Sequence, residues 1–348
     1  MLHFAGDVLS ETGLGRKCCC VLIWDAKLAG ELFFVSSGSD SSVIRFLSTA
    51  IVCLAALALT LPAAGEDFRL LAWNVESNRP NQPPVSNPLV IAEQLTELMK
   101  DPATTAEVIV LSEVDPVTVL RFQKAVAEGL GTEVDYVTSA SGGFEDTDSL
   151  LVIVNKQRFR IDEVMELHRY AGIAANFNNA ETDSADFGAM RARSPLAVKL
   201  FDLKSNDSFW VVANHLARGE AELRTDQARM LVKWAADQSV PVITAGDFNF
   251  DYEFKTQRGN PGYQAMMEGG VWEWVKPDPL VDSNWSDDRQ AVGQRADRYP
   301  DSILDFVFVA KGAKQWQAES DVVVRPNDFP DNDQTSDHRP LIARFKKP

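Results

Sequence analysis

The sequence predicts an α/β fold, with mixed β-sheets covered by helices, in a single domain that spans residues 66–348. Three observations lead to this prediction. Apolar runs of strand length recur along the chain, segments with helical spacing separate only some of them, and polar side chains follow several of the runs. No repeat, linker or composition break divides residues 66–348, and the composition is that of an ordinary globular protein.

The first part of the domain is predicted to alternate strands with helices. The run FRLLAWNV indicates a buried strand over residues 68–75. A helix over 89–99, a strand over 108–114, a helix over 116–130 and a strand over 148–155 follow in that order. Residues 171–192 are rich in Ala, Asn, Asp and Gly and are predicted to form a loop.

The second part begins with a predicted hairpin, whose strands span 195–201 and 209–215. The clearest helix follows over 220–236, and strands over 241–249, 303–309 and 341–345 complete the series. The stretch 250–300 is predicted to be long and irregular, and it contains Trp272, Trp274 and Trp285. Core packing is expected for the first two because they alternate like one face of a short strand; alternatively, one tryptophan stacks on a base or sugar.

Residues 1–65 are predicted to lie outside the domain. Arg45 precedes an uncharged run over 46–65 that contains IVCLAALALTL and ends in small residues, which is typical of a secretory signal. We therefore predict a signal peptide over residues 43–65, with an uncleaved membrane anchor as the alternative. Residues 1–42 precede this signal and are predicted to be untranslated or disordered. A secreted or periplasmic location follows from these expectations.

Cysteine placement and charge exclude several classes of function. All four cysteines precede residue 66, so the domain needs no disulfide and can use neither thiol catalysis nor cysteine-bound zinc. The formal net charge of −16 disfavours tight non-specific binding of nucleic acid. Hydrolysis of phosphate esters stays open, because a bound metal ion reverses the local field.

Polar residues near the ends of predicted strands form a candidate site. Asn74, Glu113, His215 and Asp247 each lie at or just after the end of an apolar run. In layered α/β folds, ligands bind at such strand ends. The sequence therefore predicts that these four side chains gather at one rim of the domain.

The residue types at this rim suit a metal and a proton acceptor. Glu113 and Asp337 offer the oxygen ligands that Mg²⁺ prefers. His338 is a candidate general base, and Asp305, a lone charge in the apolar run ILDFVFV, is expected to need a partner. His168 is expected to be a surface or packing residue.

An ordered set of short motifs resembles the endonuclease/exonuclease/phosphatase superfamily. The motifs are WNV (73–75), SEV (112–114), ARSPLAV (192–198), NHL (214–216), GDFN (246–249), LDFVFV (304–309) and SDHRPL (336–341). Each motif is weak alone, but their order over residues 68–346 makes the signal specific. The resemblance implies a four-layer α/β/β/α sandwich of two packed mixed sheets with outer helices, and a Mg²⁺ or Mn²⁺ site at one rim.

The resemblance also implies which residues hold the metal and contact the substrate. Asn74, Glu113 and Asp337 match the metal-side positions. Asn74 also matches a substrate contact, and Arg193 is a candidate contact on the phosphate side. The family often has Gln where Ser112 stands here, so a hydrogen bond behind the metal ligand is expected to differ.

Catalytic roles are implied in the same way. His338 resembles the general base and Asp305 its orienting partner. Asp247 resembles the acid that positions water or assists the leaving oxygen. His215 resembles a second histidine that stabilises developing charge or protonates the leaving group. Asn249 resembles a donor to the non-bridging phosphate oxygens, and so a substrate contact as well.

These expectations predict a secreted phosphoester hydrolase that depends on Mg²⁺ or Mn²⁺, acts as a phosphodiesterase or nuclease and is monomeric. Extracellular nucleic acid is the favoured substrate. Two alternatives stay open: a lipid or inositol phosphate hydrolase, and a catalytically inactive binding protein on the same fold. Substrate choice is expected to depend on residues 250–300, where Arg258, Arg289, Arg295 and Arg298 form a local basic cluster.

Overall fold

The computed structural model describes residues 67–77, 86–140, 148–167, 193–284, 302–325 and 334–348, which all lie in the compact unit Leu61–Pro348. The predictions for residues 1–42, the signal peptide 43–65, the loop 171–192 and His168 lie outside these ranges. So do those for Trp285, Arg289, Arg295 and Arg298. Among the described helices, none is long and apolar enough to cross a membrane.

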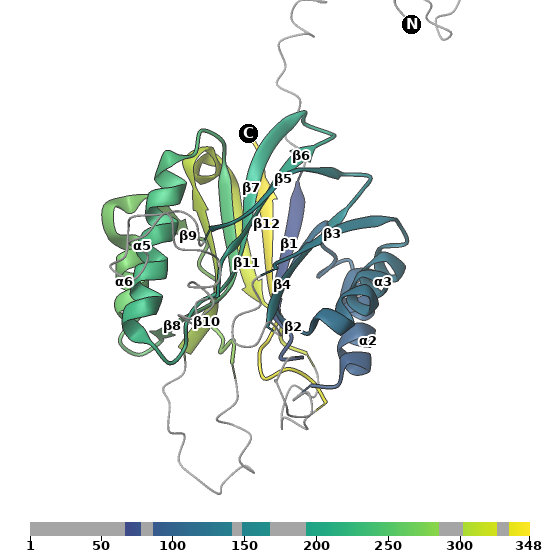
Figure 1. The fold of residues 1–348 in the computed structure, drawn as a ribbon, viewed down its shortest axis with the longest axis horizontal. Coiled ribbons are helices and arrows are strands. Elements are labelled where there is room, and N and C mark those ends of the chain that lie inside the picture. Colours follow the sequence, from purple (N-terminus) through teal and green to yellow (C-terminus); the bar gives the residue numbers. More distant parts are fainter. Residues whose placement is uncertain (1–66, 78–85, 141–147, 168–192, 285–301, 326–333) are drawn as a thin grey trace, which may run out of the picture. The chain divides into compact units, whose positions relative to one another are not determined.

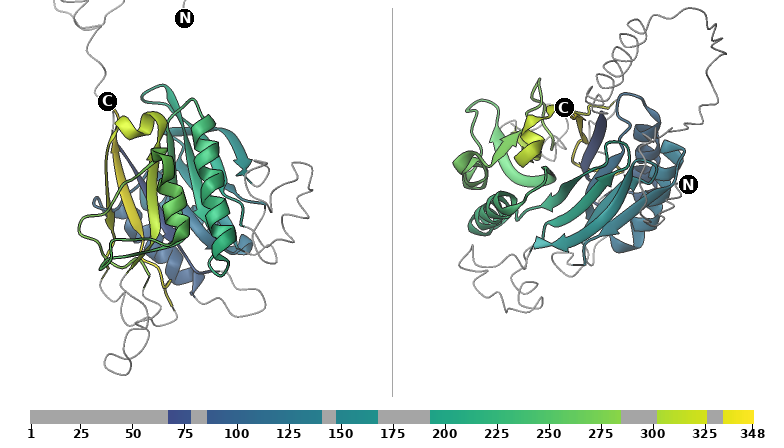
Figure 2. Two further views of the ribbon diagram at one scale, coloured as in Figure 1. Left: turned by 90° about the vertical axis from the view of Figure 1, so that its left-hand side faces the viewer. Right: turned by 90° about the horizontal axis from the view of Figure 1, so that it is seen from above.

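Two six-stranded mixed sheets pack face to face, with helices on both outer sides (Figures 1 and 2). The first sheet has the order β11-β12-β1-β2-β4-β3, and the second has the order β5-β6-β7-β8-β10-β9. The strands of the first sheet are β1 (Phe68–Asn74), β2 (Val108–Val114), β3 (Val134–Thr138), β4 (Ser149–Asn155), β11 (Gln317–Val322) and β12 (Leu341–Lys346). Those of the second are β5 (Phe159–Glu166), β6 (Leu196–Asp202), β7 (Asp207–His215), β8 (Val242–Glu253), β9 (Trp272–Trp274) and β10 (Ser302–Ala310). The predicted four-layer sandwich is confirmed.

Within the described residues, four α-helices form the outer layers, with short 3₁₀ turns between some elements. The helices are α2 (Pro88–Lys100), α3 (Val119–Leu130), α5 (Ala221–Asp237) and α6 (Pro261–Met267), and the 3₁₀ turns are η1 (Pro116–Thr118), η5 (Glu268–Gly270) and η6 (Lys311–Gln315). Helix α2 begins after Asn87, whose side chain accepts a hydrogen bond from the Leu89 amide at 3.0 Å. Helix α3 ends at Gly131, whose φ of 64° favours glycine. Local sequence therefore sets these two helix boundaries.

Alternation along the strands divides the apolar side chains among three clusters. One cluster fills the space between the sheets, with residues such as Ala72, Ala213 and Ala245. A second joins the outer face of the β1–β2 sheet to α2 and α3, and the third joins the other sheet to α5 and α6. Successive residues of a strand point to opposite faces, so each central strand serves two clusters. This double burial explains their nearly continuous apolar sequences.

The strands that the sequence did not reveal are the four sheet edges: β11 and β3 in one sheet, and β5 and β9 in the other. Edge strands keep one side exposed, and polar sequences such as QAESDV in β11 protect that edge. They therefore lack the apolar run by which the central strands are found. Trp272 and Trp274 of β9 pack in the α5–α6 cluster, so the prediction of core packing for these two residues is confirmed.

The prediction of an irregular stretch over 250–300 is wrong in its first part. Strand β8 continues to Glu253, and α6 and β9 follow within it. The polar residues of the GDFN motif do not end the strand, because β10 pairs with β8 along this extension, as far as Ser302 opposite Glu253. Tertiary pairing has here overridden local turn chemistry.

Candidate active site

The candidate site continues the inner face of the sandwich where its apolar residues stop. Ile243 and Ala245 face the inter-sheet core, and Asp247 follows them at the same alternation on β8. Pairing with β7 sets His215 opposite Asp247, and pairing with β10 sets Asp305 opposite it on the other side. Three polar side chains from neighbouring strands are thus brought to one rim of the second sheet.

A close approach of β7 and β8 requires glycine just before Asp247. Gly246 has a φ of 128°, and a Cβ atom there would lie 2.3 Å from the Asn214 carbonyl oxygen. Any side chain at this position would push the two strands apart. The glycine of the GDFN motif therefore serves the pairing that sets His215 beside Asp247.

Glu113 reaches the site from the opposite sheet through an irregular backbone. The pairing of β2 with β4 shifts between Leu111 and Val114, and Glu113 adopts a φ of 53°. Such bulges redirect side chains at the ends of strands. Ser112, at the position where the family often has Gln, is buried with no partner for its hydroxyl among the described residues.

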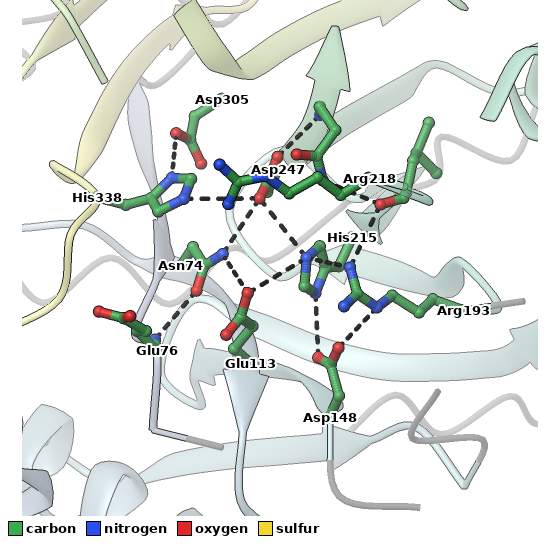
Figure 3. A network of polar contacts seen from close by, with 12 residues as sticks. Asn74, Glu76, Glu113, Asp148, Arg193, His215, Arg218, Asp247, Asp305 and His338 are labelled. Atoms are coloured by element: carbon green, nitrogen blue, oxygen red, sulfur yellow. Dashed lines mark hydrogen bonds and ion pairs between the residues drawn. The ribbon is translucent and has the colours of Figure 1, made fainter. Parts of the chain in front are cut away.

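Asp247 lies at the centre of the polar network drawn in Figure 3. Its Oδ2 atom is 3.6 Å from His215 Nε2 and 3.8 Å from His338 Nε2. Asn74 joins the two sheets, because its Nδ2 donates to Asp247 Oδ2 at 3.1 Å and to Glu113 Oε1 at 3.0 Å. Burial alone would raise the pKa of Asp247, but the two histidines and hydrogen bonds from Asn249 and Asn74 together outweigh burial and lower it.

His338 lies outside a regular strand and is held by the residues around it. Ser336 Oγ donates to the Asn74 carbonyl at 2.6 Å and accepts from the His338 amide at 3.0 Å. Trp73 Nε1 donates to the His338 carbonyl at 2.8 Å. The serine of the SDH motif thereby ties this segment to β1.

The imidazole of His338 pairs with Asp305, as the lone charge in the β10 sequence suggested. The distance from His338 Nδ1 to Asp305 Oδ2 is 2.7 Å, and both side chains are buried. Burial alone would lower the pKa of His338, but Asp305, Asp337 and Asp247 together raise it well above 6.5. In the metal-free protein this imidazole therefore holds its proton near neutral pH.

His215 has a matching carboxylate that the sequence did not reveal. Asp148, the residue before β4, lies 3.0 Å from His215 Nδ1 and forms an ion pair of 2.7 Å with Arg193 Nε. Burial alone would raise the pKa of Asp148, but His215, Arg193 and a hydrogen bond from the Glu113 backbone together outweigh burial and lower it. Arg193 Nη1 also contacts His215 Nε2. In the sequence, Asp148 is marked only as a charged residue before the apolar run of β4, and this feature does not indicate which residue it pairs with.

A family model described as the endonuclease/exonuclease/phosphatase family matches residues 71–338. The chain belongs to this family. No curated protein matches the chain in sequence.

Solved structures of the family share this fold at low sequence identity. A Bacteroides vulgatus endonuclease/exonuclease/phosphatase matches with a TM-score of 0.58 and 15% identity, over 81% of this chain and 100% of that chain. D. rerio TDP2 complexed with single-strand DNA product matches with a TM-score of 0.54 and 15% identity, over 81% and 100% of the two chains. A Bacteroides thetaiotaomicron mannosyl-6-phosphatase matches with a TM-score of 0.52 and 13% identity, over 80% and 99%. At such identities the likeness shows the fold alone.

The family's metal dependence can be tested against the donor atoms present. Glu113, His215 and Asp247 each offer a ligand atom, and these atoms all lie within 4.8 Å of one another. His215 Nε2 is 3.4 Å from Glu113 Oε1. Ligand distances of about 2.0–2.2 Å place two atoms bound to one ion at most roughly 4.4 Å apart. The three side chains therefore fit a shared divalent cation after small shifts.

This set differs from the predicted metal ligands, with Glu113 common to both. Asn74 turns its Nδ2 toward the carboxylates, while its Oδ1 accepts from the Glu76 amide at 3.0 Å. The backbone amide of Asp337 donates to Glu76 Oε2 at 3.0 Å, and Asp337 Oδ1 lies 3.8 Å from His338 Nε2. Asn74 and Asp337 stay predicted ligands, and Glu76 is a further buried acid that the sequence did not suggest.

Burial of the second-sheet residues extends to Asn249. Its φ is 51°, its amide donates to Asp247 Oδ1 at 2.8 Å, and its Nδ2 donates to the Leu216 carbonyl at 3.0 Å.

Burial raises the pKa of Glu113 despite nearby His215 and Arg193. A buried carboxylate that is not fully compensated is stabilised by an added cation, which agrees with the donor geometry.

Proposed function

We propose that this family member is a divalent-metal-dependent phosphoester hydrolase that acts as a phosphodiesterase or nuclease. One observation carries the proposal: Asp247 Oδ2 lies between the Nε2 atoms of His215 and His338, and each imidazole is oriented by its own carboxylate. A histidine held at Nδ1 by an acid can move a proton at Nε2. Two such histidines can serve the attacking and the leaving oxygen.

In the proposed reaction, His338 takes a proton from water through Nε2, and Asp247 orients that water. His215 gives a proton to the leaving oxygen or stabilises its charge. Asn74, Asn249 and Arg193 donate hydrogen bonds to non-bridging phosphate oxygens. Mg²⁺ or Mn²⁺ would be held by Glu113 with Asp337 as a predicted further ligand, and would supply positive charge beside the phosphoryl group. In this arrangement His215 Nε2 is not a metal ligand, so it stays available for the leaving oxygen.

The raised pKa of His338 makes its role sensitive to local charge. A general base must be free of its proton near the working pH. Asp305, Asp337 and Asp247 all raise the pKa of His338, so offsetting the negative charge of the last two lowers that pKa. Proton release by this histidine is therefore expected to be coupled to metal loading.

Nucleic acid is proposed ahead of other phosphoesters as the substrate. D. rerio TDP2 was solved with a single-strand DNA product, while the mannosyl-6-phosphatase is named for a phosphorylated sugar. The family fold thus serves both kinds of substrate, and the rim loops must select between them. A lipid or inositol phosphate remains the alternative substrate, and a monomer is proposed.

A substrate panel tests this proposal most directly. DNA, RNA, sphingomyelin and inositol phosphates are each incubated with purified residues 66–348 and Mg²⁺ or Mn²⁺. We expect hydrolysis of at least one phosphodiester, complete loss after metal stripping, and recovery when metal returns. Undiminished turnover in excess chelator would refute the metal-dependent mechanism. No hydrolysis of any substrate would favour a catalytically inactive binding protein.

Export is proposed from the sequence of residues 43–65. The positive charge, the apolar centre and the small residues at the end of the run are the supporting features. Expression of the whole chain with N-terminal sequencing of the product tests the proposal. A mature terminus near Glu66 in the exported fraction is expected, while a full-length cell-associated product would contradict it.

A further inference from the structure

The side chain of Arg218 is a cation near the site to which no role has yet been assigned. Arg218 lies three residues after His215, between β7 and α5, and it is exposed. Figure 3 shows its side chain extending back toward Asp247 and His338. Its carbonyl accepts a hydrogen bond, but no described residue pairs with its guanidinium.

The backbone that carries Arg218 is fixed by buried side chains of α5. Arg224 Nη1 donates to the carbonyls of Ala217 and Arg218 at 2.9 and 2.6 Å. Gln227 accepts from the Ala217 amide at 2.9 Å and donates to the Arg193 carbonyl at 2.8 Å. Arg224 is only 7% exposed and Gln227 is fully buried. These hydrogen bonds hold the backbone at Arg218 in place before a ligand binds, so binding has only the side chain to order.

Arg193 and Arg218, which flank the site, differ in their charge balance. Arg193 is neutralised by its ion pair with Asp148. Among the described residues, Arg218 has no ion-pair partner, in a chain whose formal net charge is −16. A guanidinium is suited to paired contacts with phosphate oxygens. An arginine that no described residue neutralises and that points toward Asp247 and His338 is thus placed for an anionic substrate.

We propose that Arg218 binds a non-bridging oxygen of the scissile phosphoryl group and stabilises the charge that develops there. The inference rests on the proposed phosphoester hydrolysis and adds a substrate-binding residue to that site. The scissile group is favoured over a neighbouring phosphate because Arg218 points toward Asp247 and His338, the residues assigned to the attacking water. A contact of this kind strengthens as charge builds in the transition state.

Kinetics on two substrates test which phosphate Arg218 contacts. Arg218→Gln is compared with Arg218→Lys on bis(p-nitrophenyl) phosphate and on a single-stranded oligonucleotide, with Mg²⁺ or Mn²⁺. We expect kcat/KM to fall by about 10- to 100-fold on both substrates, the range for one charge-assisted hydrogen bond, and lysine to restore part of it. A loss confined to the oligonucleotide, or no loss, would overturn the proposal.

Arg229→Gln is the matched control, because Arg229 is an exposed arginine of α5 that pairs with Asp226. It removes the same charge outside the site and should leave both rates within about twofold. Calorimetric titration with inorganic phosphate, with and without Mg²⁺, gives a readout independent of turnover. Arg218→Gln should weaken phosphate binding and Arg229→Gln should not. If the native chain hydrolyses neither substrate but only Arg218→Gln weakens phosphate binding, the proposed hydrolysis is wrong and the contact between Arg218 and the anion is supported. Equal phosphate binding by the two variants would reject that contact.

Discussion

Two buried charged clusters lie at opposite ends of β7. Asp202 pairs with Asp207, the first residue of that strand, whereas His215 is its last residue. At the first end, which we call the structural cluster, Asp202 contacts Arg158 at 3.0 Å and Lys347 at 2.7 Å. Burial raises the pKa of Asp202, but hydrogen bonds from these two cations outweigh it and lower the pKa strongly. The structural cluster is complete within the chain.

The active-site cluster is compensated differently. Asp247 is as deeply buried, but it faces two imidazoles and the Asn74 amide, and burial raises the pKa of nearby Glu113. Permanent cations hold the structural cluster in one charge state, whereas titratable groups leave the active-site cluster open to protons and a metal. Incomplete compensation is thus the physical mark that separates a reactive cluster from a structural one.

Removing His338, the proposed base of the active-site cluster, should have the largest effect. His338→Ala is expected to lower kcat by roughly 10²–10⁴-fold, because proton transfer to a positioned side chain contributes that much. Kinetics at saturating substrate, with near-ultraviolet circular dichroism to verify folding, measure the effect. A folded His338→Ala protein that turns over at the native rate would show that another group is the base.

Breaking the structural cluster should instead reduce stability. Lys347→Met keeps an apolar stem near the aromatic rings of Phe209 and Trp316 but leaves Asp202 without one cation. Loss of one partner of a buried ion pair costs about 3–5 kcal/mol, and the remaining Arg158 favours the lower end. Urea unfolding measures the cost, and kcat of the folded fraction should be unchanged.

The exposed neighbour Lys346 provides the matched control for this prediction. Lys346→Met removes the same charge and should change the free energy of unfolding by less than about 0.5 kcal/mol. Equal losses in the two variants would mean that net charge, rather than the buried pair, explains the effect.

Changes in pH should distinguish the two clusters through smaller changes in the free energy of unfolding. The pKa of His338 is raised above 6.5, so its contribution is complete below that pH and is lost as pH rises through the raised value. The pKa of Asp202 is lowered below 3.8, so its contribution is complete above that pH and is lost as pH falls through the lowered value. The free energy of unfolding of the metal-free protein is measured as a function of pH. Its pH dependence should become weaker at alkaline pH in His338→Ala and at acid pH in Lys347→Met. Unchanged slopes in both variants would contradict the assignment.

Much of the fold was readable because an apolar run of strand length is a local feature of the sequence. The central strands bury both faces and so show as apolar runs, while the four edge strands carry charges on their exposed side and escaped notice. The boundary of β8 was misplaced for a related reason. Whether GDFN ends a strand depends on what pairs beyond it, and β10 supplies that pairing.

By itself, the sequence determined the positions of the central strands and the types of side chain that follow them. It also indicated that a lone Asp305 within an apolar run needs a partner, which is His338. Only the tertiary structure decided that Asp148 meets His215 across 67 positions of sequence and that a bulge turns Glu113 toward both. Alternation depends on neighbouring residues, whereas these meetings depend on strand register and on the packing of two sheets, which no local pattern encodes.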